Sequence, residues 1–133
     1  MRQILFRGLR TDGKGWLYGL PAKIIGDWYV IPEEGYDSPD NYKVNPETIG
    51  QFTGEIDDAG NAIFEGDQLN ATRRYSQDGY TPVVVCFDLG SFDLYWDPLR
   101  TAMPGVCFDS LSRAKTNQCA LKVIGNIHEG GKP

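Results

Sequence analysis

The carboxylates on either side of Gly66 are the residues of this sequence whose types and spacing most resemble a reactive site. Two convergent carboxylates, here Glu65 and Asp67, can hold a divalent metal or share acid–base work. No histidine and no third acid lies close to them in the sequence. Glycine adopts backbone conformations that other residues avoid, and aspartate accepts hydrogen bonds within its own turn. We therefore predict a structural turn at Gly66 and Asp67; a small metal-dependent hydrolase built on these acids is the least favoured alternative.

The other motifs that suggest chemistry are incomplete. Asp57, Asp58 and Asn61 resemble a fragment of a calcium loop, but the spacing and the closing glutamate of that motif are missing, so we predict a tight, solvated polar turn over 57–61. His128, the only histidine, lies beside Glu129 near the end of a predicted strand. The three cysteines form no Cys-x-x-Cys pair, and the chain contains no nucleophile elbow, phosphate loop or dinucleotide fingerprint. We predict a protein that is not an enzyme and that uses no metal or cofactor.

Aromatic and arginine residues gather on one predicted hairpin. Rings beside guanidinium groups can stack on single-stranded bases or anchor a protein partner. The same rings can instead fill the core of the sheet. If this hairpin has a binding face, we expect the face to consist of Arg73, Arg74, Tyr75, Tyr80 and Tyr95.

The charge and composition limit the class of partner. The chain has 133 residues, a formal net charge of −5, 41% hydrophobic residues and 23% charged residues, which is typical of one globular domain. Nucleic-acid binding draws most of its free energy from neutralised phosphates, so an acidic protein favours a protein partner over DNA or RNA. The longest purely apolar run spans residues 83–87, too short to cross a membrane, and the N-terminus lacks the apolar core of a signal peptide. We expect a cytoplasmic protein.

Short strands separated by turn residues dominate the first part of the chain. An Asp-Gly turn joins the expected strands 3–7 and 15–20 into a hairpin, and shorter strands are expected at 24–25 and 28–31. Asn45 and Pro46 suit the start of one helical turn, which Gly50 can close in a left-handed conformation.

The remainder of the chain predicts a small antiparallel sheet. Residues 51–54 start another extended segment, and Gly54 is predicted to be a structural turn residue. A β-branched run at 83–85 favours a central strand. A short helix capped by Asp109 is expected at 109–114, and the last strand at 121–127. The fold class is therefore mainly β, a small SH3-like or barrel-like antiparallel sheet with N-terminal hairpins packed on it. Edges of such a sheet also make a homo-oligomer plausible.

We expect a single domain over residues 1–133 with three parts. Residues 1–50 form N-terminal strands and a loop, 51–129 the barrel-like part, and 130–133 a tail with nothing to bury.

Three sequence blocks in this order resemble the YopX family of phage and prophage proteins. The first is residues 1–7 followed by 14–19, the second is 44–54 followed by 63–67, and the third is 123–129. The resemblance implies a mostly β fold with a barrel-like part and an origin in a phage or prophage, hence a location in the cytoplasm of a bacterial host cell. It implies no reaction and no catalytic residue. Residues 98–119 match none of these blocks and are expected to be a variable insertion.

Taken together, these observations predict a noncatalytic phage accessory protein that binds another macromolecule. A protein of the host or of the phage is the first choice of partner, and single-stranded nucleic acid is the alternative.

Overall fold

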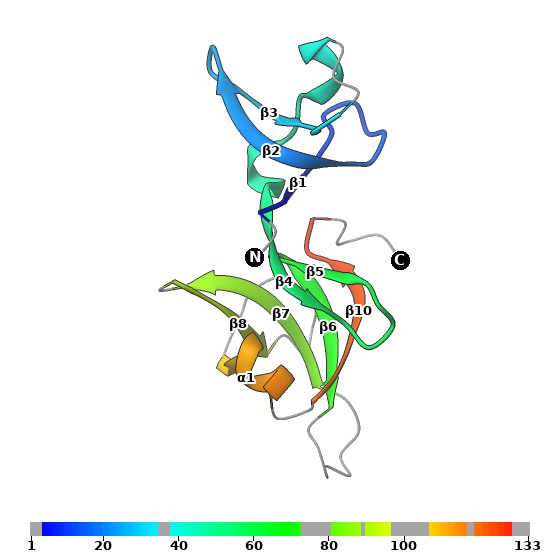
Figure 1. Cartoon of the computed structure of the whole chain (residues 1–133), viewed down its shortest axis with the longest axis vertical. Coiled ribbons are helices and arrows are strands. Elements are labelled where there is room, and N and C mark those ends of the chain that lie inside the picture. The colour runs from blue at the N-terminus through cyan, green and yellow to red at the C-terminus, as the bar shows by residue number, and fades with distance from the viewer. Residues whose placement is uncertain are drawn as a thin grey trace. The chain divides into compact units, whose positions relative to one another are not determined.

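The chain folds into two antiparallel β-sheets, which confirms the prediction of a mainly β protein (Figure 1). The computed structural model describes residues 4–34, 38–72, 81–88, 90–96, 107–116 and 119–128. The chain divides into two compact units, Met1–Phe52 and Thr53–Pro133. In the described part, the first sheet has the strand order β3-β2-β1-β4-β5 and the second has the order β10-β6-β7-β8-β9.

Three strands form the N-terminal unit: β1 (Phe6–Leu9), β2 (Trp16–Ile24) and β3 (Asp27–Ile31). β2 changes partner along its length, because residues 16–19 pair with β1 and residues 20–24 pair with β3. The expectation of separate strands at 15–20 and 24–25 is wrong for this reason. Pro21 lies beyond the ladder with β1, so its missing N–H costs that ladder nothing.

The small core of this unit lies between the hairpin and the segment that follows it. That segment contains two 3-10 turns, η1 (Pro39–Tyr42) and η2 (Pro46–Thr48). Val30 and Val44 are fully buried, and a Cβ added to Gly8 would lie only 3.0 Å from Val30 Cγ2. A larger residue at this position would force Val30 and Val44 to shift, so glycine suits the close approach of β1.

Thr48 rather than Asn45 organises the second 3-10 turn. The Thr48 hydroxyl donates a hydrogen bond to the Asn45 carbonyl (2.6 Å) and accepts one from the Leu9 N–H (2.8 Å), whereas the Asn45 side chain makes no capping bond. Gly50 does not close the turn in a left-handed conformation but begins β4 (Gly50–Ile56), where it pairs with Arg7. Asn45 and Pro46 start the turn as predicted, but the prediction for Gly50 is wrong, because pairing with β1 holds Gly50 in an extended strand.

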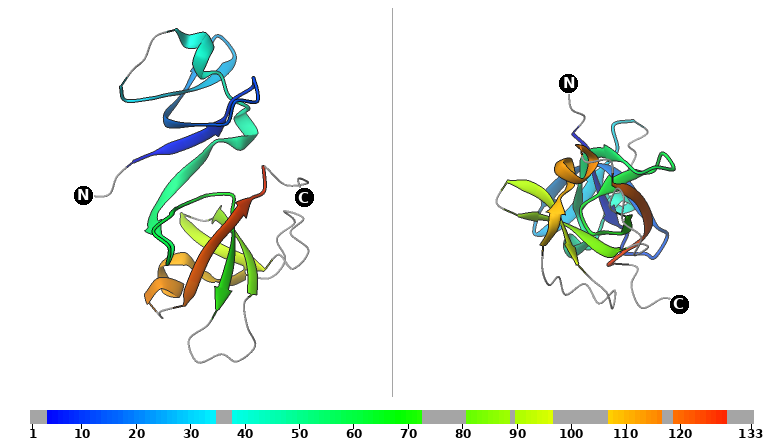
Figure 2. Two further views of the ribbon diagram at one scale, coloured as in Figure 1. Left: turned by 90° about the vertical axis from the view of Figure 1, so that its right-hand side faces the viewer. Right: turned by 90° about the horizontal axis from the view of Figure 1, so that it is seen from below.

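The C-terminal unit holds the second sheet and also β5, which belongs to the first sheet. Its further elements are β5 (Ala62–Phe64), β6 (Asp67–Thr72), β7 (Thr81–Asp88), β8 (Ser91–Trp96), β9 (Cys107–Ser110), α1 (Leu111–Thr116) and β10 (Ala120–Asn126). Figure 2 shows β10, in red, running antiparallel beside β6. Among the described strands, β10 and β9 are the two edges of this sheet, and the sheet does not close into a barrel.

Alternating apolar residues of these strands form one core. Its members are buried side chains from five strands, α1 and the residue before β10: Ile63, Leu69, Ala71, Val83, Val85, Leu94, Leu111, Ala114, Cys119 and Leu121. Residues one position apart on a strand point to opposite faces, so the neighbouring positions Asn70 and Lys122 face outward. The helix begins at Leu111, and the Ser110 hydroxyl accepts a hydrogen bond from the Arg113 N–H (3.2 Å). Ser110 therefore supplies this cap, which the sequence assigned to Asp109.

Candidate functional site

The predicted binding face on the long hairpin lies mostly outside the described residues. Arg73, Arg74, Tyr75 and Tyr80 belong to the segment 73–80, which the structure does not describe. Tyr95 is a half-buried residue of β8, where it is paired with Val84 of β7 and Cys107 of β9. The binding face therefore stays a prediction.

The turn between β5 and β6 is built on Gly66 and Asp67. Gly66 has a φ of +90°, in the left-handed region that favours glycine. The side chain of Asp67 is almost fully buried, and its Oδ2 accepts a hydrogen bond from the Phe64 N–H (2.8 Å). The Gly66 N–H donates to the Val85 carbonyl (2.8 Å). In this geometry the turn anchors the start of β6.

His128 lies against the same turn, although it is far from it in the sequence. A Cβ added to Gly66 would be 3.4 Å from His128 Nε2, and the Ile127 N–H donates to the Gly66 carbonyl (2.9 Å). Asn126 is paired with Asp67 in the sheet and accepts a hydrogen bond from the His128 N–H (2.9 Å). Among the described residues, no three His, Cys, Asp or Glu side chains lie together in a way that could hold a metal ion. The contacts that these residues do make hold β6 and β10 together.

The polar turn at residues 57–61 is centred on the buried carboxylate of Asp57. Its Oδ1 accepts hydrogen bonds from the N–H groups of Asn61 (2.7 Å) and Ala59 (3.0 Å). Its Oδ2 accepts from the Val123 N–H (2.9 Å) and from Asn61 Nδ2 (3.2 Å). Burial by itself raises the pKa of Asp57, but these donors favour the charged form and hold the pKa below its usual value. Both oxygens are thus engaged by protein donors in the loop that resembles a calcium-site fragment.

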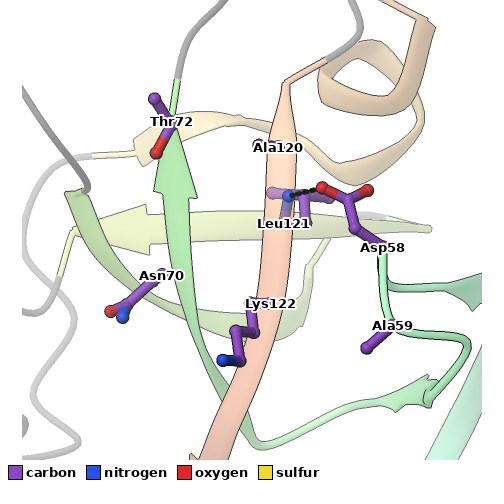
Figure 3. Close-up of a pocket in the computed structure, with 7 residues that line it drawn as sticks. All are labelled: Asp58, Ala59, Asn70, Thr72, Ala120, Leu121 and Lys122. Carbon is purple, nitrogen blue, oxygen red and sulfur yellow. Dashed lines mark hydrogen bonds between the residues drawn. The ribbon is translucent and has the colours of Figure 1, made fainter. Parts of the chain in front are cut away.

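The C-terminal unit has an open hollow of about 450 Å³ beside this turn (Figure 3). It is lined by residues of the 57–61 turn, β6 and β10: Asp58, Ala59, Asn70, Thr72, Ala120, Leu121 and Lys122. A hydroxyl becomes a nucleophile only with a base in hydrogen-bond reach. Figure 3 shows Thr72 and Asp58 on opposite sides of β10, and Asp58 Oδ2 accepts from the Leu121 N–H (3.2 Å). The hollow therefore offers polar contacts but no nucleophile–base pair among the residues drawn.

A second surface lies on the N-terminal unit, and we call it the β2–β3 apolar surface. It consists of Tyr18, Leu20, Ile24 and Ile25, which are 48%, 52%, 41% and 98% exposed. The first three alternate along β2 and so point to one face of the strand. Half-buried Trp16 continues this row.

Ile25 forms the tip of the β2–β3 hairpin together with Gly26. Among the described residues, Ile25 is the one non-glycine residue with a positive φ, +47°. A β-branched residue is strained in that conformation. Strained residues tend to persist where function requires them. Ile25 therefore combines backbone strain with almost complete exposure of its side chain.

Sequence reasoning did not identify the β2–β3 apolar surface. The alternation along β2 shows that one face is apolar, but such a face normally becomes core. The signal that was present is the pair Ile24 and Ile25 directly before a Gly-Asp turn, where a hairpin tip usually carries polar residues.

Comparisons with known proteins bear on the family. The second sequence block forms a 3-10 turn with β4 (residues 44–54) and the β5–β6 turn (63–67). The third block includes the end of β10. A search of curated proteins gives no match. No helix in the described part of the chain is long and apolar enough to span a lipid bilayer. The family model described as YopX protein matches residues 20–132, which is most of the chain, and this protein therefore belongs to the YopX family.

Proposed function

We propose that this protein is a noncatalytic module that binds a protein partner through the β2–β3 apolar surface. The observation that carries the proposal is the exposure of four large apolar side chains, from Tyr18 to Ile25, on one hairpin. Scattered apolar residues are normal on protein surfaces, but contiguous ones mark interaction sites. Membership of the YopX family supports a role in phage or prophage biology in the bacterial cytoplasm, and this setting is part of the proposal.

The size of the surface is suited to a protein interface. Full burial of one such side chain is worth about 1.5–3 kcal/mol at about 25 cal/mol per Å², so at their exposed fractions the four residues present roughly 150–300 Å² of apolar area. A stable interface buries about 800 Å² on each partner, and a little over half of that is apolar. The hairpin thus supplies a substantial part of the apolar area of one interface of standard size.

The chemistry of the surface favours protein over nucleic acid. Isoleucine and leucine side chains fill apolar pockets on proteins, whereas single-stranded bases need flat rings and nearby cations. The guanidinium of Arg7 lies 4.3 Å from the centre of the Trp16 ring, and Arg7 is only 7% exposed. This cation is therefore engaged beneath the surface rather than presented to phosphate.

A capture experiment with matched variants tests the proposal. Leu20→Glu combined with Ile25→Glu puts two charges into the β2–β3 apolar surface, and Ile56→Glu is the control because Ile56 is as exposed as Leu20 but lies in β4. We expect wild type and the control to recover the same proteins from infected cells, and the double variant to lose them. Equal recovery by a folded double variant would refute the assignment of this surface.

A further inference from the structure

The polar turn at residues 57–61 occupies the β10 edge of the second sheet, which has the strand order β10-β6-β7-β8-β9. Edge strands carry unpaired N–H and C=O groups that can pair with another chain. In β10 the N–H groups of Leu121 and Val123 point away from β6, toward the side chains of Asp58 and Asp57.

The turn makes the contacts that a neighbouring strand would make. Asp58 Oδ2 accepts from the Leu121 N–H (3.2 Å), and the Asp58 N–H donates to the Leu121 carbonyl (3.0 Å). Two positions along, Asp57 Oδ2 accepts from the Val123 N–H (2.9 Å). Outward-facing groups on an edge strand recur every second residue, so the two carboxylates match the repeat of a strand ladder.

The same edge carries a second protective feature. The register between β10 and β6 shifts between Val123 and Gly125, so that Ile124 is an extra residue in the strand. Such bulges twist an edge away from further pairing. Ile124 is still 38% exposed, so an apolar side chain lies beside the capped groups. An exposed apolar side chain favours pairing of an edge whose backbone groups are free.

We propose that the 57–61 turn is an edge cap, and that its two carboxylates prevent copies of this chain from pairing through β10. The expected occupant of an uncapped edge is a second copy, because two identical edges can pair antiparallel about a two-fold axis. This inference concerns the C-terminal unit and does not depend on the β2–β3 apolar surface.

Purified variants test the cap through their mass in solution. Asp58→Ala removes the bond between its carboxylate and the Leu121 N–H, and Asp57→Ala with Asp58→Ala removes both carboxylate contacts, while the bond from the residue 58 N–H to the Leu121 carbonyl stays. Lys122→Ala, on the solvent face of β10, is the matched control. By light scattering over a concentration series, we expect the double variant to show about a two-fold or larger mass relative to wild type and the control. A folded double variant with the mass of wild type overturns the proposal.

Two further measurements keep the test decisive. If the double variant does not fold, Asp58→Ala alone is measured, and exchange of the Leu121 amide hydrogen is the second readout. We expect this amide to exchange roughly ten-fold faster than in wild type, and the Lys122 amide to exchange at an unchanged rate. Unchanged exchange at Leu121 overturns the proposal.

Ile124→Lys added to an associating variant places a charge at the edge and should restore the mass of wild type. Association that persists shows that β10 is not the interface and also overturns it.

Discussion

At the scale of single residues, two turns depend on left-handed glycines whose surroundings differ. Gly66 (φ +90°) has the ring of His128 beside it, whereas Gly60 (φ +88°) has no atom within 4 Å of an added Cβ. A Cβ added to Gly66 would lie 3.4 Å from His128 Nε2, which is an ordinary contact. Glycine is therefore required at both positions because of the positive φ of the backbone, and not because neighbouring atoms leave no room for a side chain.

We expect Gly66→Ala and Gly60→Ala to lower the free energy of unfolding by similar amounts, about 1–2 kcal/mol each. Urea denaturation followed by circular dichroism measures both. A loss at Gly66 that is several times larger than at Gly60 would mean that the contact with His128, and not the backbone, sets the requirement.

Asp57 is a buried carboxylate whose ionisation is coupled to folding. Its pKa in the folded protein is held below the usual value, since four hydrogen bonds outweigh the effect of burial. A lowered pKa means that the folded state favours the carboxylate. The resulting stability is present above the pKa of an unfolded aspartate, about 4, and is lost as the pH falls through the lower pKa of the folded state.

We expect Asp57→Asn to cost about 2 kcal/mol or more at pH 7, because an amide replaces a charged acceptor of several N–H groups. The difference from wild type should shrink as the pH is lowered below about 4, where wild type also loses the charge. Denaturation curves over a pH series measure this. A difference that does not change with pH would show that the charge of Asp57 is not what the turn requires.

At the scale of elements, two features constrain the β2–β3 hairpin: the backbones of the two strands approach closely at Gly19, and Ile25 at the tip has a strained backbone conformation. A Cβ on Gly19 would lie 2.0 Å from the Ile31 carbonyl oxygen, so only glycine fits where β2 passes from β1 to β3. At the tip, Ile25 is strained and exposed, so it has no evident role in the stability of the hairpin. Its side chain is thus available for a contact outside the unit.

We expect Ile25→Asn to leave stability unchanged or to raise it by up to about 1 kcal/mol, because asparagine tolerates a positive φ better than isoleucine. The same variant should weaken capture of a partner. Thermal unfolding and the capture experiment measure the two effects separately. A marked loss of stability would show that Ile25 packs within the fold and does not serve as a contact.

At the scale of the whole molecule, charge is the property that constrains partners. The formal net charge of −5 repels polyphosphate backbones at low ionic strength, where such repulsion is least screened. The apolar hairpin and the acidic charge together fit a protein partner, and a partner with basic residues most of all.

We expect no binding of a labelled single-stranded oligonucleotide by fluorescence anisotropy, even at low salt. Phosphate contacts strengthen steeply as salt is removed, so low salt is the condition that would reveal them. A basic single-strand-binding protein is the positive control. Salt-sensitive binding by this chain would favour the nucleic-acid alternative and the arginines of 73–74 as its site.

Local patterns in the sequence determined the class of the fold and several of its turns. The glycine-punctuated extended runs predicted a mainly β protein, and the blocks at 44–54, 63–67 and 123–129 indicated the family. The prediction of a turn over 57–61 rested on nearby residues and is confirmed, because a turn is a short-range structure. The expectation that this turn is solvated is wrong for Asp57, whose side chain is buried.

Only the tertiary structure decided which faces are buried and which partners each strand has. Alternation along β2 is the same whether its apolar row faces a core or solvent, so exposure of Leu20 could not be deduced from it. The 57–61 turn meets β10 across more than 60 residues, as the separation of Asp57 and Val123 shows. Such contacts depend on how distant segments pack, and a local pattern carries no information on that packing.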